Sequence, residues 1–408
     1  MRIRSFVALC VFAAIAAAPS ASGATGFTWT ESPVAVASGD QFDPSAGSTT
    51  ITYTDTSGGN ADVRYYDVVD GTTHVVAGGP GDQQLSDVHD GGYGPLVVYT
   101  SSNGGPADIF SYEIVTGTTA QLTSAPADQI NPAVSSQLVV YEDYSSGSSD
   151  ICRYSLLDST TFCLGKPGDQ VSPAVTFARV VYIDVASGSS VVLWDTASGT
   201  TRTLDAGPAV SPDIDGTHVV YTLGTGSPLD VATYDLASGT RKVLALPGDQ
   251  VNPHISGDWI SFEDQVSGVS HLGLWNYVTG EVEHPNVGPS SQSLSDIIGN
   301  RVVYTDNRNG NLDVFMLEFV PPVSVDGQIG GLIGDVQALG LPKGTQTSLL
   351  AKLSDAQAAL KVGNTAAACS DLGSFISETS AQSGKKIAAS DAAALIAKAQ
   401  QIEASIPC

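Results

Sequence analysis

Short runs of alternating apolar and polar residues, separated by turns rich in Gly, Ser, Asp and Asn, recur along most of the chain. Alternation with a period of two residues is typical of β-strands that bury one face. In the stretch that begins at Ala127, the pattern predicts four strands, which span 132–135, 138–143, 150–156 and 161–164. Each such stretch therefore predicts one antiparallel sheet of four strands.

The four-strand unit occurs seven times. An Asp-Gln pair follows the first residue of most units, and an aromatic residue closes the second strand of each. The units start at Gly39, Gly81, Ala127, Gly168, Gly207, Gly248 and Ser290. A period of about forty residues with several strands per unit is the signature of a β-propeller. The sequence thus predicts a mainly β fold, a seven-bladed β-propeller of four-stranded antiparallel blades.

The last unit predicts how the ring closes. Its third strand is followed by Pro321 and Pro322, so this unit lacks a fourth strand of its own. Residues 32–37 near the N-terminus resemble the fourth strands of the other units. We expect this N-terminal strand to complete the last blade, because closure leaves no open sheet edge.

The first residues of the chain have the order of a secretory signal. Arg2 and Arg4 precede an apolar run over 6–18, and small residues follow up to Ala24. We interpret residues 1–24 as a signal peptide and expect a secreted, extracellular protein. No later apolar run approaches the roughly 18 residues that a membrane span needs.

Four cysteines remain once Cys10 is removed with the signal, and an oxidising compartment lets them pair. Four cysteines allow three pairings. Proximity along the sequence favours two local disulfides, Cys152–Cys163 and Cys369–Cys408.

The formal net charge is −25, and nearly all of it lies in the repeats, where 9 Lys and Arg accompany 36 Asp and Glu. Such a surface repels nucleic acid, so we expect no nucleic-acid partner. It suits solubility, divalent cations or basic partners.

The composition changes after the repeats. We interpret residues 321–327 as a linker because two prolines and a short polar run suit neither a helix nor a paired strand. Residues 328–408 are rich in Ala, Leu, Lys and Gln, and apolar residues at helical spacing predict a small bundle of four helices. Asn364 and Ser390 are the expected N-caps of the third and fourth helices.

Two resemblances to known families rest on short motifs. Asn252-Pro253-His254-Ile255-Ser256, followed by Trp259-Ile260-Ser261-Phe262, resembles the repeats of TolB-like β-propeller proteins, and the pattern extends through the domain at 25–320. This resemblance implies a docking platform, a ligand binder or, occasionally, an enzyme domain. Leu341-Pro342-Lys343-Gly344 and Ser374-Phe375-Ile376 resemble the FIMAH-type helical module of secreted bacterial proteins. That resemblance implies an accessory unit for attachment outside a bacterial cell.

Several acidic motifs have a structural interpretation beside a functional one. The Asp-Gln pairs could form a ring of ligand-binding carboxylates, but we favour a role in closing turns between blades and bonding neighbouring backbone. The turn from Asp306 to Asp313 has oxygen ligands at close spacing, as a calcium loop would. It lacks the glutamate at the twelfth position and contains Arg308, so we favour a hairpin turn.

The first strand of each unit predicts a site at the propeller axis. An apolar residue lies seven positions after each start, and if it packs between blades, the residue before it faces the central channel. Around the closed ring, five of these preceding residues form a continuous polar arc, and Ala133 and Ala174 occupy the other two positions. The arc consists of Asp213, His254, Asp296, Ser45 and Asp87.

Carboxylates that share one channel repel each other and favour a compensating charge. We consider three forms of compensation: a divalent cation such as Ca²⁺ held by Asp87, Asp213 and Asp296, a basic group of a partner, or a raised carboxyl pKa. The alternative is a water-filled channel in which screening makes compensation unnecessary.

These patterns favour a secreted, monomeric, non-catalytic binding or scaffold protein, which uses its propeller to dock an extracellular protein or glycan and carries a helical accessory module. The alternative is an extracellular hydrolase or lyase that acts on polysaccharide or peptide through the central pocket of the propeller. Neither a His-Glu-x-x-His nor a Gly-x-Ser-x-Gly motif occurs. We therefore favour binding over catalysis.

Overall fold

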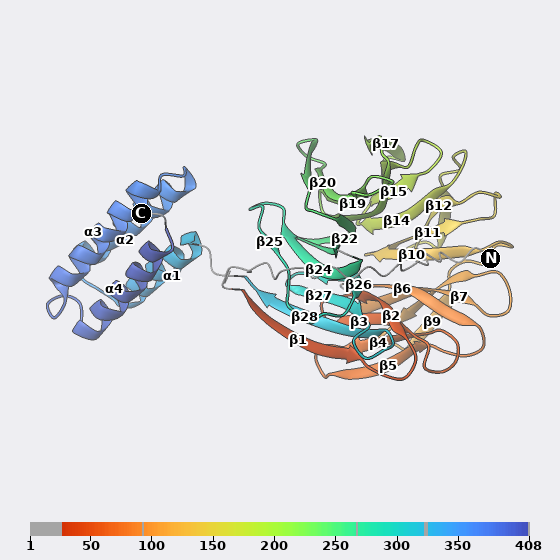
Figure 1. Cartoon of the computed structure of the whole chain (residues 1–408), viewed down its shortest axis with the longest axis horizontal. Coiled ribbons are helices and arrows are strands. Elements are labelled where there is room, and N and C mark those ends of the chain that lie inside the picture. The colour runs from red at the N-terminus through yellow and green to blue at the C-terminus, as the bar shows by residue number, and fades with distance from the viewer. Residues whose placement is uncertain (1–26, 92–93, 267, 322–324, 407–408) are drawn as a thin grey trace. The chain divides into compact units, whose positions relative to one another are not determined.

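The computed structural model describes residues 27–91, 94–266, 268–321 and 325–406 (Figure 1). The described chain divides into two compact units, a β unit over Trp29–Val320 and a helical unit that follows Pro321. The predicted signal peptide, residues 1–24, lies outside the described residues.

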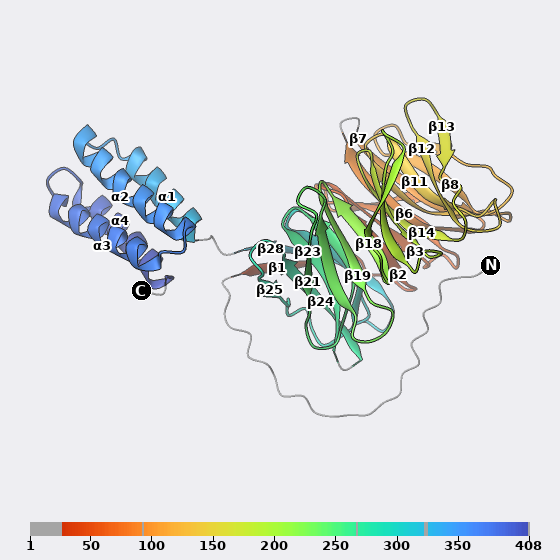
Figure 2. The ribbon, with the colours of Figure 1, turned by 90° about the horizontal axis from the view of Figure 1, so that it is seen from above.

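The β unit consists of seven sheets, each of four antiparallel strands, and confirms the predicted seven-bladed propeller. Figure 1 shows the blades arranged in a ring, with first strands such as β6, β10 and β14 toward the middle and fourth strands such as β5, β9 and β17 toward the rim. Figure 2 shows the same blades after a rotation by 90°.

The first four blades, each from its inner to its outer strand, are β2 (Gln41–Ala46), β3 (Thr50–Asp55), β4 (Asp62–Asp67) and β5 (Thr72–Ala77); β6 (Asp82–Gly91), β7 (Gly94–Ser102), β8 (Asp108–Glu113) and β9 (Thr118–Gln121); β10 (Gln129–Ser135), β11 (Leu138–Asp143), β12 (Asp150–Ser155) and β13 (Thr160–Cys163); and β14 (Gln170–Thr176), β15 (Arg179–Asp184), β16 (Ser190–Asp195) and β17 (Thr200–Asp205).

The last three blades are β18 (Ala209–Asp215), β19 (His218–Leu223), β20 (Asp230–Asp235) and β21 (Thr240–Leu244); β22 (Asp249–Ser256), β23 (Trp259–Val266), β24 (Val269–Asn276) and β25 (Val282–Glu283); and β26 (Gln292–Ile298), β27 (Arg301–Asp306), β28 (Asp313–Val320) and β1 (Thr28–Ala35).

The hydrophobic core of the propeller lies between neighbouring blades. One cluster of buried residues joins Val63 and Tyr65 of the first blade to Val88, Val97 and Tyr99 of the second. The aromatic residue that closes each second strand belongs to this layer and is nearly or completely buried in every blade. Apolar burial of this kind supplies most of the stabilisation of a fold, at about 25 cal/mol per Å².

The Asp-Gln pairs have the structural role that we favoured. The Asp accepts a hydrogen bond from a backbone amide of the preceding blade, as Asp128 does from Ala107 at 2.9 Å and Asp249 from Leu229 at 2.9 Å. The Gln amide donates to the carbonyl two residues before it, as Gln129 does to Ala127 at 2.6 Å. The pairs therefore join consecutive blades through charge-assisted bonds to backbone amides.

The N-terminal strand closes the ring, as predicted, because β1 pairs with β28 in the last blade. Arg308 donates to both carboxylate oxygens of Glu31 on β1, at 2.9 and 2.7 Å, and Tyr304 also donates to Glu31. Asp40 accepts the amide of Leu312 at 3.0 Å, which repeats the Asp-Gln joint between the last blade and the first. Asp306 and Asp313 pair across a hairpin, which is the interpretation that we favoured for the turn between them.

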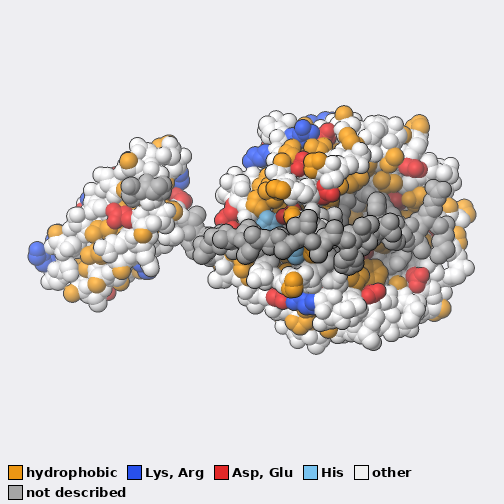
Figure 3. Space-filling view, viewed as in Figure 1, with side chains coloured by type: hydrophobic (Ala, Val, Ile, Leu, Met, Phe, Trp, Pro, Cys, Tyr) orange, Lys and Arg blue, Asp and Glu red, His pale blue; other side chains and the backbone are white. Residues whose placement is uncertain are grey.

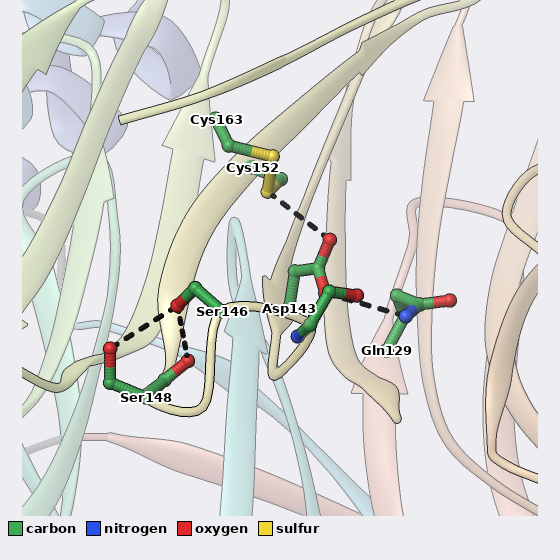
Figure 4. Close-up of a disulfide and its surroundings, with 7 residues drawn as sticks. Gln129, Asp143, Ser146, Ser148, Cys152 and Cys163 are labelled. Carbon is green, nitrogen blue, oxygen red and sulfur yellow. Dashed lines mark hydrogen bonds between the residues drawn. A yellow bond between two sulfur atoms is a disulfide. The ribbon is translucent and has the colours of Figure 1, made fainter. Parts of the chain in front are cut away.

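A disulfide links Cys152 on β12 to Cys163 on β13, which are direct cross-strand partners (Figure 4). This is the first predicted pair. Asp143 lies beside it, with a carboxylate oxygen 3.8 Å from the Cys152 sulfur. The second predicted pair includes Cys408, which lies outside the described residues.

The helical unit contains α1 (Val325–Ala338), α2 (Lys343–Lys361), α3 (Thr365–Gln382) and α4 (Ala389–Ala404), which bury one apolar cluster. Asn364 caps α3, as predicted, by accepting the amide of Ala367. Two expectations were wrong. Helix α1 begins at Val325, inside the predicted linker, because Val325 packs against the apolar cluster. Ser390 lies within α4, whose N-cap is Ala388.

None of the four helices, within the described residues, is long and apolar enough to cross a membrane.

Candidate ligand site in the propeller channel

A cavity of about 570 Å³ lies where the first strands of the seven blades meet. Every blade contributes to the wall, through β2, β6, β10, β14, β18, β22 and β26. The described residues that line it include no Lys or Arg but five aspartates: Asp43, Asp87, Asp213, Asp215 and Asp296. The cavity therefore suits polar or cationic groups. On the face that Figure 3 shows, acidic side chains are scattered among hydrophobic, polar and basic ones.

All five residues of the predicted polar arc line this cavity. Ser45 comes from β2, Asp87 from β6, Asp213 from β18, His254 from β22 and Asp296 from β26. Ala133 and Ala174 line it as well. The structure thus brings the whole predicted arc together.

Three aspartates of the arc connect neighbouring blades. One carboxylate oxygen of each accepts the amide of the following residue, and the other accepts an amide of the next blade. For Asp213, these donors are Ile214 at 2.8 Å and Ile255 at 3.0 Å. Equivalent pairs at 2.7–2.9 Å serve Asp87, through Val88 and Val134, and Asp296, through Ile297 and Ala46.

His254 lies between two of these aspartates. Its Nδ1 is 3.6 Å from a carboxylate oxygen of Asp213 and 3.6 Å from one of Asp296. Burial alone would lower the pKa of His254, but Asp213 and Asp296, with a smaller contribution from Asp43, outweigh burial and raise that pKa to about 9. Burial would likewise raise the pKa of Asp213, but His254 and two backbone amides hold it below its usual value. This side of the channel therefore contains its own cation.

On the opposite side of the arc, Asp87 accepts a hydrogen bond from the Ser45 hydroxyl at 2.8 Å. Burial raises the pKa of Asp87 to about 7, although two backbone amides and Ser45 act against the shift. Burial also raises the pKa of Asp296. Raised carboxyl pKa values, one of the expected forms of compensation, thus occur here.

The three aspartates considered as calcium ligands do not converge on one point. Among the described residues, the one group whose ligand atoms lie within 4.8 Å of one another is Asp143, Cys152 and Cys163, and its sulfurs are joined in the disulfide. Asp87, Asp213 and Asp296 instead direct both oxygens to backbone amides. A shared divalent ion gains no support from this geometry.

The wall also contains a second set of residues, which the sequence pattern did not predict. In all seven blades, the pairing of the first and second strands shifts register at the same place, which is a β-bulge. The bulge residue has a left-handed backbone, with φ near 50°, in six blades. Five of these residues line the cavity: Asp43, Asn131, Ser172, Ser211 and Asn252. The available signal was an Asp, Asn or Ser four places after the start in five of the seven units, since Asn and Asp tolerate this conformation.

Asp43 differs from the other aspartates of the wall. No hydrogen bond to its carboxylate occurs within the described chain, whereas Asp215 accepts the amide of Gly257 at 2.8 Å and the remaining three are bonded as above. Burial raises the pKa of Asp43 to about 6, and the charge of Asp296 adds to the shift while that of His254 opposes it. Asp43 is thus the wall carboxylate free to meet a ligand.

Comparisons with known proteins support the fold. The sequence matches no protein-family model and no curated protein. Among solved structures, an oligogalacturonate lyase from Vibrio parahaemolyticus aligns with a TM-score of 0.54 and 7% identity, over 72% of this chain and 96% of that one. The β-propeller domain of the Trilobed protease from Pyrococcus furiosus aligns with a TM-score of 0.53 and 10% identity, over 69% of this chain and 95% of that one. TolB from Acinetobacter baumannii aligns more loosely, with a TM-score of 0.41 and 12% identity, over 67% of this chain and 78% of that one.

At these identities, the first two likenesses establish the β-propeller fold alone and say nothing about activity. The Pyrococcus domain is described as having an open velcro topology. In this chain, the ring is closed by β1 from the other end of the propeller sequence. The fold and the cavity together define a closed seven-bladed β-propeller with a polar axial channel.

Proposed function

We propose that this chain is a secreted, non-catalytic binding protein whose propeller channel receives a ligand or a group of a docked partner. The observation that carries the proposal is the polar cavity of about 570 Å³, to which all seven blades contribute. Bonds to backbone amides hold its aspartates in place, so the wall is organised before a ligand arrives.

Binding is favoured over catalysis because most of the acidic groups are already used. Asp87, Asp213, Asp215 and Asp296 accept hydrogen bonds from backbone amides. Of the five wall aspartates, this leaves Asp43 as the acid or base for a hydrolase or lyase that acts on polysaccharide or peptide. Such a group must lie within hydrogen-bond reach of the proton that it transfers.

The proposal also places the protein outside a bacterial cell. The signal-like residues 1–24 support export, and the Cys152–Cys163 disulfide suits an oxidising compartment. Within this proposal, the propeller is TolB-like and the helical unit is a FIMAH-type accessory module that attaches the monomeric chain to an extracellular surface. A protein or a glycan is the partner class that we propose.

A paired substitution tests the channel as the binding site. The purified chain is screened against glycans and peptides, with saturable binding and product formation measured together. Ala174→Trp places a large side chain in the channel, whereas Ala197→Trp places the same side chain on an exposed turn of the same blade. We expect saturable binding without turnover, which Ala174→Trp abolishes and Ala197→Trp leaves intact.

Two results would contradict the proposal. Turnover of any glycan or peptide that Ala174→Trp abolishes would establish the enzymatic alternative. Binding that survives Ala174→Trp at full affinity, in a variant whose melting temperature matches that of the wild type, would place the site elsewhere.

A further inference from the structure

We propose that the channel binds a protonated amine, the alkylammonium group of a lysine side chain or of a polyamine, and that Asp43 is the carboxylate that meets it. The inference rests on the proposed function, because it names the ligand class for the same cavity.

The charges around the wall are unevenly compensated. His254 lies 3.6 Å from both Asp213 and Asp296, and backbone amides bond the same two carboxylates. The other histidine of the wall, His89, is expected to be neutral, since burial lowers its pKa. Asp43 has neither an amide nor a cation hydrogen-bonded to it within the described chain, and the charge of His254 acts on it without a bond, so its carboxylate oxygens are left for a ligand.

The arrangement favours an organic cation over a metal ion. A metal ion needs several oxygen atoms converging at 2.0–2.6 Å from one point. The described wall residues form no such cluster, and their carboxylates are dispersed over four blades. An ammonium group needs no such convergence, because one charge-assisted hydrogen bond to a free carboxylate anchors it and water can accept its other hydrogen bonds.

The test variant is Asp43→Asn, and the fold itself provides its precedent. Asn131 and Asn252 occupy the same bulge position in other blades, with φ values of 56° and 50° beside 54° at Asp43. The substitution therefore removes the charge without straining the backbone. Asp355→Asn is the matched control, since it makes the same change of charge at an exposed position on α2.

The experiment is calorimetric titration of the full chain, at pH 8 and low ionic strength, with spermidine, with the peptide Gly-Lys-Gly and with the same peptide acetylated on its lysine. We expect saturable binding of at least one cationic probe and none of the acetylated peptide. Asp43→Asn should weaken binding by about tenfold or more, the effect of losing one charge-assisted hydrogen bond, and Asp355→Asn should leave it unchanged.

The two cationic probes distinguish the sources of the amine. Binding of spermidine alone supports a free polyamine, and binding of the peptide alone supports a lysine of a partner protein. Equal affinity for wild type and Asp43→Asn, equal affinity for the acetylated peptide, or no binding of either cation overturns the inference. Suppose that the inference is overturned but the screen finds another ligand whose binding Ala174→Trp abolishes. In that case only the ligand class was wrong. If Ala174→Trp abolishes the binding of no ligand, the proposed function fails as well.

Discussion

Asp213 and Asp43 line the same cavity and are the same residue type, yet their surroundings differ. Asp213 accepts amides from two blades and lies beside His254, which keeps its pKa low. Asp43 lies on a bulge without such partners, and burial raises its pKa to about 6. A carboxylate in this channel therefore joins two blades where backbone amides of both donate to it, and it is free for a ligand where none does.

The largest effect should come from removing the joint that closes the ring. Deletion of Thr28–Ala35 exposes the edge of β28 and the apolar side chains that pack against Val34 and Ala35. It also removes the ion pair between Glu31 and Arg308. We expect the free energy of unfolding to fall by several kcal/mol, about 3–5. Urea denaturation measures it, with Glu31→Gln as a milder control. An unchanged transition midpoint would show that β1 does not hold the ring.

The same substitution at the two aspartates should have opposite effects. Asp213→Asn leaves one acceptor oxygen where two amides donate, so we expect a loss of about 1–3 kcal/mol at neutral pH. Because the pKa of Asp213 is lowered from 3.8, its contribution is present above that pH and disappears as pH falls below it. Urea denaturation of both proteins at pH 7 and pH 3 measures whether Asp213→Asn is less stable than the wild type and whether the difference shrinks at low pH. A wild-type stability for Asp213→Asn at pH 7 would contradict the structural role.

His254 should give the propeller a pH dependence on the alkaline side. Its pKa is raised from 6.5 to about 9, so the stabilisation is complete below pH 6.5 and is lost as pH rises through 9. Allowing for a side chain that is 39% exposed, we expect a loss of about 1–2 kcal/mol over this range.

His254→Gln should remove most of this slope, most clearly above pH 7.5, where Asp87 with its pKa of about 7 no longer contributes. Melting temperatures from pH 6 to pH 10 provide the measurement. A parallel slope in the variant would refute the ion pair.

Asp43→Asn should have the smallest effect and the opposite sign. The pKa of Asp43 is raised from 3.8 to about 6, so its ionisation costs stability as pH rises through this range. The variant escapes that cost, and we expect it to be about 1 kcal/mol more stable than the wild type at pH 8 and no more stable at pH 3.5. Destabilisation at pH 8 would mean that Asp43 has a structural partner after all.

Much of the fold could be predicted from the sequence because its signals are local and repeated. Alternation defined the strands, the period near forty defined the blades, and the missing fourth strand after Phe319 pointed to closure by the N-terminal strand. The disulfide was also predictable, since Cys152 and Cys163 flank one hairpin turn and become cross-strand partners. The linker end and the fourth helix cap were missed, because packing of Val325 and the start at Ala389 depend on the bundle core.

The sequence by itself determined that five of the wall side chains enter the channel, since strand alternation places Ser45, Asp87, Asp213, His254 and Asp296 on one side of the inner strands. Only the tertiary structure decided what each does there. The partners of Asp87 and Asp213 are amides of the next blade, 42 to 47 residues away, and the rotation between blades sets that contact. The bulge that brings Asp43 to the wall is likewise a property of strand pairing, and it separates the free carboxylate from those that hold the ring together.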